Sequence, residues 1–390
     1  MYRIYLINFL LAISTTVGMT IIPFLITDSL GLSLFILGLI EGSSEFLSNV
    51  FRLANGVLFD KIKNKRILFV SSTALAFFSK SLLFLPTPWA VLFAKIFERI
   101  ANGTFASPRD AYVASLAKNK GTALGFLNVS KTFGCILGPL IVSLSTFFIG
   151  GLNDNLHYFI VLCCVLVFPA LLLSFTLNVK QVKEKIFSTR DLKNVYKSIL
   201  PILILTFLFF MGRFNDGLLM IHLKQNDFPE WFYLSTIAIF NTIMLVCSPI
   251  IGQQIDKGNL KKVLYLSIGS LVIFNICFYE VGFLGWSMAI IGILSWGIQR
   301  AGAQIVLSTL VFKSVEQTQY GTAIGLFYLF SGVATMFSSF ICGYMATNDN
   351  FTSVFLFSGF FALFALVFAA YLLNQTQFRF SSKTVAMGHS

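Results

Sequence analysis

Charged side chains inside apolar sequence are the residues of this chain that could do chemistry. The stretch "FERIANGTFASPRDAYVASL" holds four of them between long apolar segments, namely Glu98, Arg99, Arg109 and Asp110. A charge at the centre of a membrane helix costs about 2.5–3.5 kcal/mol, so such residues are rarely incidental. They act either as working groups or as structural ion pairs between helices. The charges that we expect well inside apolar segments are Glu41, Glu45, Arg52, Lys80, Lys95, Glu98, Arg99, Lys131, Arg213, Asp216 and Arg300.

Carboxylates of this set could carry protons, because a carboxylate in a low-dielectric cavity can take up and release a proton near neutral pH. The main candidates for proton coupling are Glu45 and Asp216, followed by Glu41 and Glu98. Steps of three and four residues place one polar set on a single helical face. This set must face the protein interior or a water-filled cavity, and it consists of Glu41, Glu45, Ser48, Asn49 and Arg52.

Arginines could hold an anionic group, since a guanidinium stays charged and binds a carboxylate or phosphate through its fork of donors. Alternatively, they could neutralise a carboxylate until a proton replaces them. In "MGRFNDG", Arg213 and Asp216 lie three residues apart on one predicted face, and the flanking glycines predict a bend. The candidates for substrate binding are Arg99, Arg213, Arg300, Asn49 and Gln299.

The elements that must position these residues are membrane helices. Hydrophobic residues make up 56% of the 390 residues and charged residues only 11%, whereas a soluble domain usually has about 25% charged residues. Runs such as "FTSVFLFSGFFALFALVFAAYLL" reach the ~20 residues that cross ~30 Å of hydrocarbon as a helix, and they are too long for the strands of a barrel. The sequence predicts an all-α polytopic membrane protein with twelve spans centred near residues 15, 46, 76, 101, 136, 167, 208, 241, 272, 299, 332 and 363.

The short connections between these spans alternate in charge. One set is basic, with Lys61, Lys63, Lys65 and Arg66 in the first such loop, while loops such as "DSLG" and "GGLNDN" lack Lys and Arg. By the positive-inside rule, the basic loops and both termini are cytoplasmic. We therefore expect a multi-pass protein of a bacterial-type inner membrane. The net charge of +12 is then a topology signal rather than a nucleic-acid footprint.

Two halves of six spans each are predicted from the long polar stretch "KQVKEKIFSTRDLKNVYK" and from internal repeats. "GTALGF" at Gly121 is echoed by "GTAIGLF" at Gly321, and "GVLFDKIKNKR" at Gly56 by "GQQIDKGNLKK" at Gly252. Such duplication places a substrate path between the halves near the bilayer midplane. The expected boundaries are a first bundle at 1–178, a cytoplasmic linker at 179–197, a second bundle at 198–375 and a cytoplasmic tail at 376–390.

The chain resembles the major facilitator superfamily of secondary transporters. That family has a Gly-x-Leu-Ala-Asp-Arg-x-Gly-Arg-Arg-type loop after its second span, and Lys63 here replaces the usual glycine. The antiporter-type run in the fifth span is incomplete, because Val142 and Ser143 stand where paired glycines normally follow. "PRDA" at Pro108 resembles a bacterial branch of mostly predicted exporters. The residues that carry the resemblance are Gly56, Leu58, Asp60, Lys61, Lys65, Arg66, Arg99, Gly103, Gly134, Gly138 and Pro139.

The resemblance also implies roles for some of these residues. In the family, a carboxylate at the end of the fourth span pairs with the basic loop and locks the cytoplasmic gate, so Asp110 would meet Lys65 or Arg66. The implied gate consists of Asp60, Lys61, Lys65, Arg66, Arg109 and Asp110. Gly134, Gly138 and Pro139 form a helix-packing motif, in which close packing and function are equally good accounts.

Several classes of site have no support in the sequence. There is no P-loop pattern, so no built-in ATPase is expected. The three histidines have no metal-ligand spacing, and the six cysteines lie in apolar runs rather than in a disulfide framework. We expect no enzyme activity, no cofactor, no metal and no nucleic-acid partner; the partners are a small-molecule substrate, protons and the lipid bilayer, and the protein is expected to be a monomer.

The leading functional hypothesis is a proton-coupled secondary active transporter that works by alternating access. It would move a drug-like compound or metabolite, with export (antiport, efflux) favoured by the Gly138–Pro139 motif and "PRDA". One alternative is a carrier, in either direction, for a carboxylate-rich metabolite such as a siderophore or organic acid, which the intramembrane arginines favour. Another is a receptor that has kept the fold without transporting.

Overall fold

The computed structural model of the chain is built from helices throughout the residues that it describes, which are 2–61, 66–116, 120–177, 192–316, 319–348 and 351–374. The first half contains α1 (Tyr2–Phe24), η1 (Leu25–Ser29), α2 (Leu34–Lys61), α3 (Arg66–Leu82), α4 (Pro88–Leu116), α5 (Lys120–Ile149), η2 (Asn153–Asn155) and α6 (Leu156–Phe175). The second half contains α7 (Leu192–Met211), α8 (Asp216–Gln225), α9 (Glu230–Asp256), α10 (Leu260–Tyr279), α11 (Val281–Leu284), α12 (Trp286–Lys313), α13 (Tyr320–Asn348) and α14 (Phe351–Asn374).

Ten helical stretches in this part of the chain are long and apolar enough to cross a membrane. The prediction of a polytopic all-α protein is thus confirmed, and each predicted span centre falls within a long helix. Two helices that hold predicted span centres, α3 and α4, are not among these ten stretches. α3 has only 17 residues, and α4 carries the charges of the stretch on which the sequence analysis began. The count of twelve spans stays a prediction for α3 and α4.

The exterior of the molecule is apolar. Phe148 is 86% exposed, and α14 displays Phe360, Phe364 and Val367 on its outer side. Polar residues such as Lys80, Lys95 and Glu98 are instead buried. This inverted distribution matches a hydrocarbon surrounding, in which polar groups are satisfied inside the protein.

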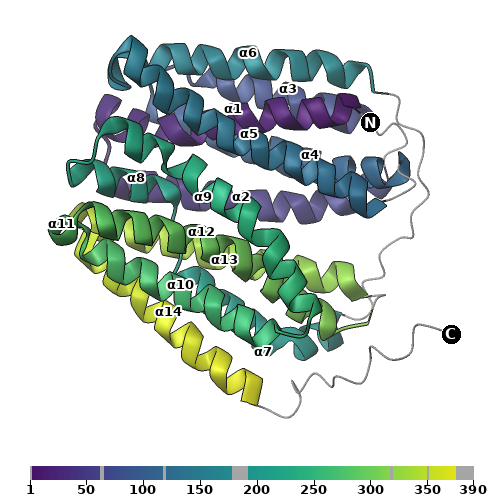
Figure 1. Cartoon of the computed structure of the whole chain (residues 1–390). Helices are drawn as coiled ribbons and strands as arrows, with labels where there is room; N and C mark the ends of the chain where they lie inside the picture. The colour runs from purple at the N-terminus through teal and green to yellow at the C-terminus, as the bar shows by residue number, and fades with distance from the viewer. Residues whose placement is uncertain are drawn as a thin grey trace.

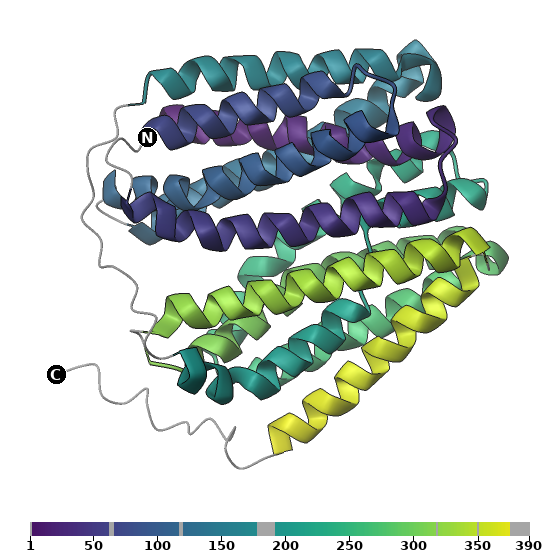
Figure 2. The ribbon, with the colours of Figure 1, turned by 180° about the vertical axis from the view of Figure 1, so that it is seen from behind.

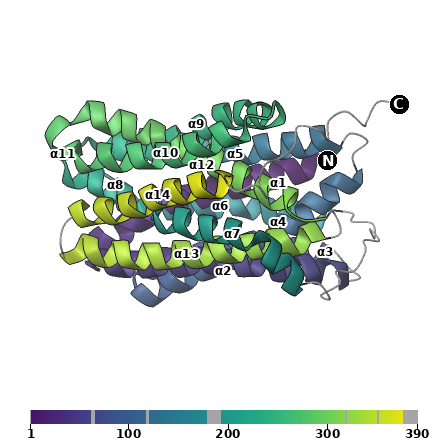
Figure 3. The same ribbon diagram turned by 90° about the horizontal axis from the view of Figure 1, so that it is seen from below.

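The long helices run roughly parallel to one another (Figure 1). In the first half α1 packs on α5 and α6, α3 packs on α4, and α2 packs on α4. In the second half α12 packs on α9 and α10, α14 on α10, and α13 on α7. The halves meet where α2 lies beside α13 and α5 beside α9, and the α2–α13 contact is seen from behind in Figure 2 and from below in Figure 3.

Glycines bring backbones close at two of these contacts. On α5, a Cβ atom added to Gly134 would lie 2.8 Å from Phe9 O of α1, and one added to Gly138 would lie 2.8 Å from Ile13 O. Gly134 and Gly138 of the predicted packing motif therefore allow α5 to pack closely against α1. Between the halves, a Cβ atom added to Gly343 of α13 would lie 2.7 Å from Leu34 O of α2. Neither contact has room for a side chain.

The seventh predicted span is interrupted at 212–215, between α7 and α8. Gly212 lies against α14, where a Cβ would be 3.0 Å from Ser358 O. Asn215 is the N-cap of α8, and its side chain accepts a hydrogen bond from Leu218 N at 2.9 Å. The bend predicted from the flanking glycines is confirmed, but it is a full break. The expectation that Arg213 and Asp216 share one helical face is therefore wrong.

Candidate functional site

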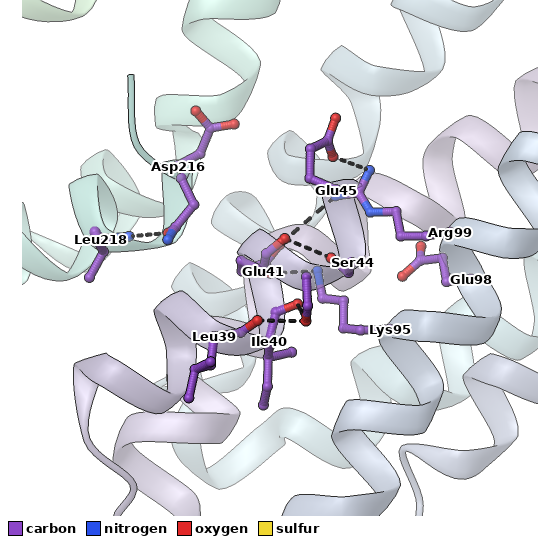
Figure 4. A network of polar contacts seen from close by, with 12 residues as sticks. Leu39, Ile40, Glu41, Ser44, Glu45, Lys95, Glu98, Arg99, Asp216 and Leu218 are labelled. Atoms are coloured by element: carbon purple, nitrogen blue, oxygen red, sulfur yellow. Dashed lines mark hydrogen bonds and ion pairs between the residues drawn. The ribbon is translucent and has the colours of Figure 1, made fainter. Parts of the chain in front are cut away.

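Two acidic residues of α2 face two basic residues of α4. Lys95 Nζ lies 2.6 Å from Glu41 Oε1, and Arg99 Nη1 lies 3.1 Å from Glu45 Oε2. Arg99 Nη2 is also 3.9 Å from Glu41 Oε2. The match arises because both pairs are spaced four residues apart, which places each pair on one helical face. Figure 4 shows this arrangement, in which the predicted polar face of α2 does point to the interior.

Burial differs within this group. The Lys95 side chain is completely buried, whereas the Glu45 side chain is 41% exposed although Arg99 holds it. Glu45 is thus accessible from outside the protein interior while it is paired with Arg99. Glu41 is buried between two cations and is less accessible.

Glu98, which directly precedes Arg99 on α4, has a different environment. Lys80 Nζ of α3 lies 2.6 Å from Glu98 Oε1, and both side chains are almost fully buried. Gly18 of α1 makes room for this pair, since a Cβ there would lie 2.7 Å from Lys80 Nζ. The Lys80–Glu98 pair thus joins three helices of the first half.

The second half supplies a carboxylate held by α12. Arg300 Nη1 lies 2.7 Å from both carboxylate oxygens of Asp216, the first residue of α8. Trp296, one turn before Arg300, donates from Nε1 to Asp216 Oδ1 at 3.1 Å. The Arg300 guanidinium also lies over the Phe240 ring of α9, 4.5 Å from its centroid. Trp296 and Phe240 are site residues that the sequence analysis missed, although the four-residue step from Trp296 to Arg300 is a usable signal.

Arg213 lies in the break between α7 and α8. Its guanidinium is 5.7 Å from the centroid of the Phe210 ring and 5.9 Å from a Trp296 ring. Among the described residues, no carboxylate pairs with it. Arg213 therefore differs from Arg99 and Arg300, each of which has a carboxylate partner.

The groups from the two halves act on one another. Arg99 interacts electrostatically with Asp216, and Arg213 with Glu45, so charges from α2, α4 and the α7–α8 break form one cluster. Figure 4 shows Glu45, Arg99 and Asp216 in the same polar region. We call the set Glu41, Glu45, Lys95, Arg99, Arg213, Asp216 and Arg300 the central cluster.

The two polar candidates lie apart from the ion pairs. Gln299 is fully buried, and neither atom of its amide has a hydrogen-bond partner among the described atoms. Asn49 lies against α13, since a Cβ on Gly332 would be 2.9 Å from Asn49 Nδ2. Asn49 thus belongs to the contact between the halves.

The predicted gate is described only in part. Asp110 pairs with its neighbour Arg109 at 2.8 Å, and Arg109 Nη1 donates to Asn8 Oδ1 of α1 at 2.7 Å. Arg66 is the exposed first residue of α3. The side chains of Arg52, Asp60 and Lys61 and all of Lys65 lie outside the described residues. Of the two predicted partners of Asp110, Arg66 forms no ion pair with it among the described residues, and the contact with Lys65 stays a prediction.

Contacts at the opposite end of the molecule join the halves. Lys224 of α8 binds Asp28 of η1, and Asn153 Nδ2 donates to the same carboxylate at 3.1 Å. Glu230, the first residue of α9, accepts a hydrogen bond from Leu152 N at 2.9 Å. We call the two contacts that cross between the halves, Lys224–Asp28 and Glu230–Leu152, the outer latch; the sequence did not predict it.

Comparisons with known proteins agree with this architecture. The model of the family described as Major Facilitator Superfamily matches residues 4–316 and 202–385. An uncharacterized MFS-type transporter of Methanocaldococcus jannaschii is 28% identical over 359 residues, which cover 88% of this chain and 87% of the relative.

Solved structures show the same fold at low sequence identity. A variant of the nucleoside transporter NupG superposes with a TM-score of 0.80 at 15% identity, covering 95% of this chain and 98% of that chain. A D-xylose–proton symporter superposes with a TM-score of 0.73 at 16% identity, covering 94% and 96%. From the family match across the chain and the shared fold, this protein belongs to the Major Facilitator Superfamily of transporters.

Proposed function

We propose that this chain is a proton-coupled secondary active transporter that moves a small organic molecule by alternating access. The observation that carries the proposal is the pair of carboxylate–arginine contacts in the central cluster. Glu45–Arg99 comes from the first half and Asp216–Arg300 from the second, and the two act on one another electrostatically.

The chemistry follows from charge neutrality. While Asp216 is ionised, it occupies Arg300 through both oxygens. A proton on Asp216 removes that charge, so Arg300 is released and can hold an anion or another carboxylate. The same exchange at Glu45 releases Arg99. Glu41 and Glu98 are secondary candidates, because each is held by a buried lysine.

Alternating access is supported by the unequal ends of the molecule. The outer latch ties the halves together at one end. Near the middle, Glu45 stays 41% exposed, and Gln304, one turn after Arg300, is exposed as well. We propose that the latch end faces outward, that both termini are cytoplasmic in a bacterial-type inner membrane, and that this conformation is open to the cytoplasm.

Export of a drug-like compound or metabolite is the preferred direction. It is supported by the Gly138–Pro139 motif, which packs α5 onto α1. A carrier for a carboxylate-rich metabolite is the second candidate, which the set of intramembrane arginines favours; Arg213, which has no ion pair among the described residues, supports binding of a carboxylate group.

Proteoliposome transport tests the proposal. The measurement is pH-gradient-driven flux of a panel of radiolabelled organic anions and cations, in both directions. We expect Glu45→Gln and Asp216→Asn to abolish gradient-driven flux while substrate exchange without a gradient survives. Glu316→Gln and Asp154→Asn are the matched controls, since both acids are exposed and outside the central cluster. Full gradient-driven flux in both cluster variants would contradict proton coupling through these residues.

A further inference from the structure

Arg213 is the cation of the central cluster that forms no ion pair with a carboxylate among the residues that the structure describes, although Asp216 and Glu45 act on it from a greater distance. The other buried cations nearby each have a partner: Lys80 with Glu98, Lys95 with Glu41, Arg99 with Glu45, and Arg300 with Asp216. Asp216 is only three residues from Arg213, but Arg300 and Trp296 already hold it. The cluster therefore has one more positive than negative charge.

The aromatic contacts of Arg213 do not replace a counter-ion. A charge at membrane depth costs about 2.5–3.5 kcal/mol on insertion scales. A cation over a ring returns ~0.5–2 kcal/mol, and both rings here are more than 5.5 Å from the guanidinium carbon, at 5.7 and 5.9 Å. An arginine that lacks a carboxylate in such a place is ready to accept an anion through its planar donors.

Side chains around Arg213 add a donor and apolar groups. Asn215 Nδ2 is buried and has no acceptor among the described atoms, because the amide oxygen of Asn215 caps α8. Trp296, which also lies near Arg213, packs against Phe214 in a tilted arrangement with 5.6 Å between ring centroids. The break at 212–215 thus combines an unneutralised cation, a spare amide donor and aromatic rings.

We propose that this break, with Arg213 at its centre, is the subsite for the carboxylate of an organic substrate, with the buried rings of Phe210 and Trp296 packed behind the guanidinium on the protein side. The proposal rests on the proposed transport function and names its substrate class. Within the central cluster as defined, one negative charge restores neutrality, so charge balance there favours a monoanion. A monocarboxylate therefore fits better than a dicarboxylate or a phosphate dianion.

Equilibrium binding to the purified full-length protein tests this proposal without any proton gradient. The probes are acids and their neutral amides of nearly the same shape: benzoate and benzamide, indole-3-acetate and indole-3-acetamide, hexanoate and hexanamide. A charge-assisted hydrogen bond contributes about 1.5–3 kcal/mol, so we expect the acids to bind about tenfold or more tightly than the amides. Arg213→Gln should remove this preference, and Arg213→Lys should keep part of it, since it keeps the charge without the fork.

The control variant is Lys257→Gln, which removes a cation from an exposed turn between α9 and α10 and should leave the preference unchanged. The proposal is overturned if no acid binds the unaltered protein more tightly than its amide, or if Arg213→Gln retains the preference. Folding of each variant is checked by its melting temperature. If Arg213→Gln is unstable, Arg213→Lys replaces it in the test, and its preference for acids should be smaller than that of the unaltered protein. If the protein prefers acids but shows no gradient-driven flux, the subsite is supported and proton coupling is rejected. If it shows gradient-driven flux but no preference for acids, proton coupling is supported and the subsite is rejected.

Discussion

Arg300 Nη1 lies 2.7 Å from both carboxylate oxygens of Asp216, although the two residues are 84 positions apart in the chain. This contact joins α12 to the start of α8. Because Asp216 neutralises Arg300, that arginine is not available to bind an anionic substrate. The charge balance of the central cluster therefore depends on Asp216.

Replacing Asp216 with Asn should change which anions bind. The variant leaves both Arg300 and Arg213 without a carboxylate, so two negative charges can then be neutralised. We expect the affinity for phthalate relative to benzoate to rise by about tenfold. The measurement is equilibrium binding of both acids, with Asp154→Asn as the control. An unchanged ratio would mean that Arg300 does not become available.

The outer latch should respond to the charges of Asp28 and Lys224. Asp28→Asn or Lys224→Gln removes the ion pair between η1 and α8. Because the pair is partly exposed, we expect the free energy of local opening at this end to fall by about 0.2–1 kcal/mol. The rate of amide hydrogen exchange there should then rise by up to about fivefold. The readout is amide hydrogen exchange of peptides covering residues 25–33 and 216–229.

A charge swap provides the control for the latch. Asp28→Lys with Lys224→Asp restores opposite charges, so exchange should return toward that of the unaltered protein. Lys257→Gln should have no effect on the same peptides. Equal exchange in the single variants and in the swap would show that the ion pair does not hold this end.

The sequence predicted the helices well, because apolar runs of this length have few alternatives. It also placed Glu41 and Glu45 on one inward face of α2, since that depends only on helical periodicity. The break between α7 and α8 followed from the glycines that flank "RFND", although its extent did not.

Partners from different helices could not be predicted, because they depend on how helices pack. Lys224 had Asp227 and Glu230 as neighbours in the sequence, but it pairs with Asp28, 196 positions away. Arg213 and Asp216 looked like one unit by spacing, but the break separates them and Arg300 takes the carboxylate. Local spacing identifies which residues are candidates, and the fold decides which of them meet.

The α1–α5 contact should not tolerate a side chain at Gly138. A Cβ there would lie 2.8 Å from Ile13 O, and backbone cannot move away cheaply. We expect Gly138→Ala to destabilise the protein by about 1–3 kcal/mol, measured as a lower melting temperature in detergent. Gly125→Ala on the same helix is the matched control, since nothing lies within 4 Å of its Cβ; it should stabilise α5 slightly through helix propensity. Equal shifts in the two variants would contradict a packing role.

The buried pair Lys80–Glu98 should be structural, which separates it from the pairs that we propose to exchange protons. Lys80→Met leaves Glu98 as an unpaired buried charge, and breaking one partner of a buried pair costs about 3–5 kcal/mol. We expect a large fall in melting temperature for Lys80→Met and a substantial recovery when Glu98→Leu is added, because the double variant buries no charge.

Transport by the double variant then decides the role of Glu98. If the pair only joins α3 to α4, a folded Lys80→Met, Glu98→Leu protein keeps gradient-driven flux, because Glu45 and Asp216 remain. If the double variant is stable but loses that flux while substrate exchange without a gradient survives, Glu98 is itself a proton-coupling group. Glu98, which is almost fully buried, and Glu45, which is 41% exposed, would then both be proton-coupling groups.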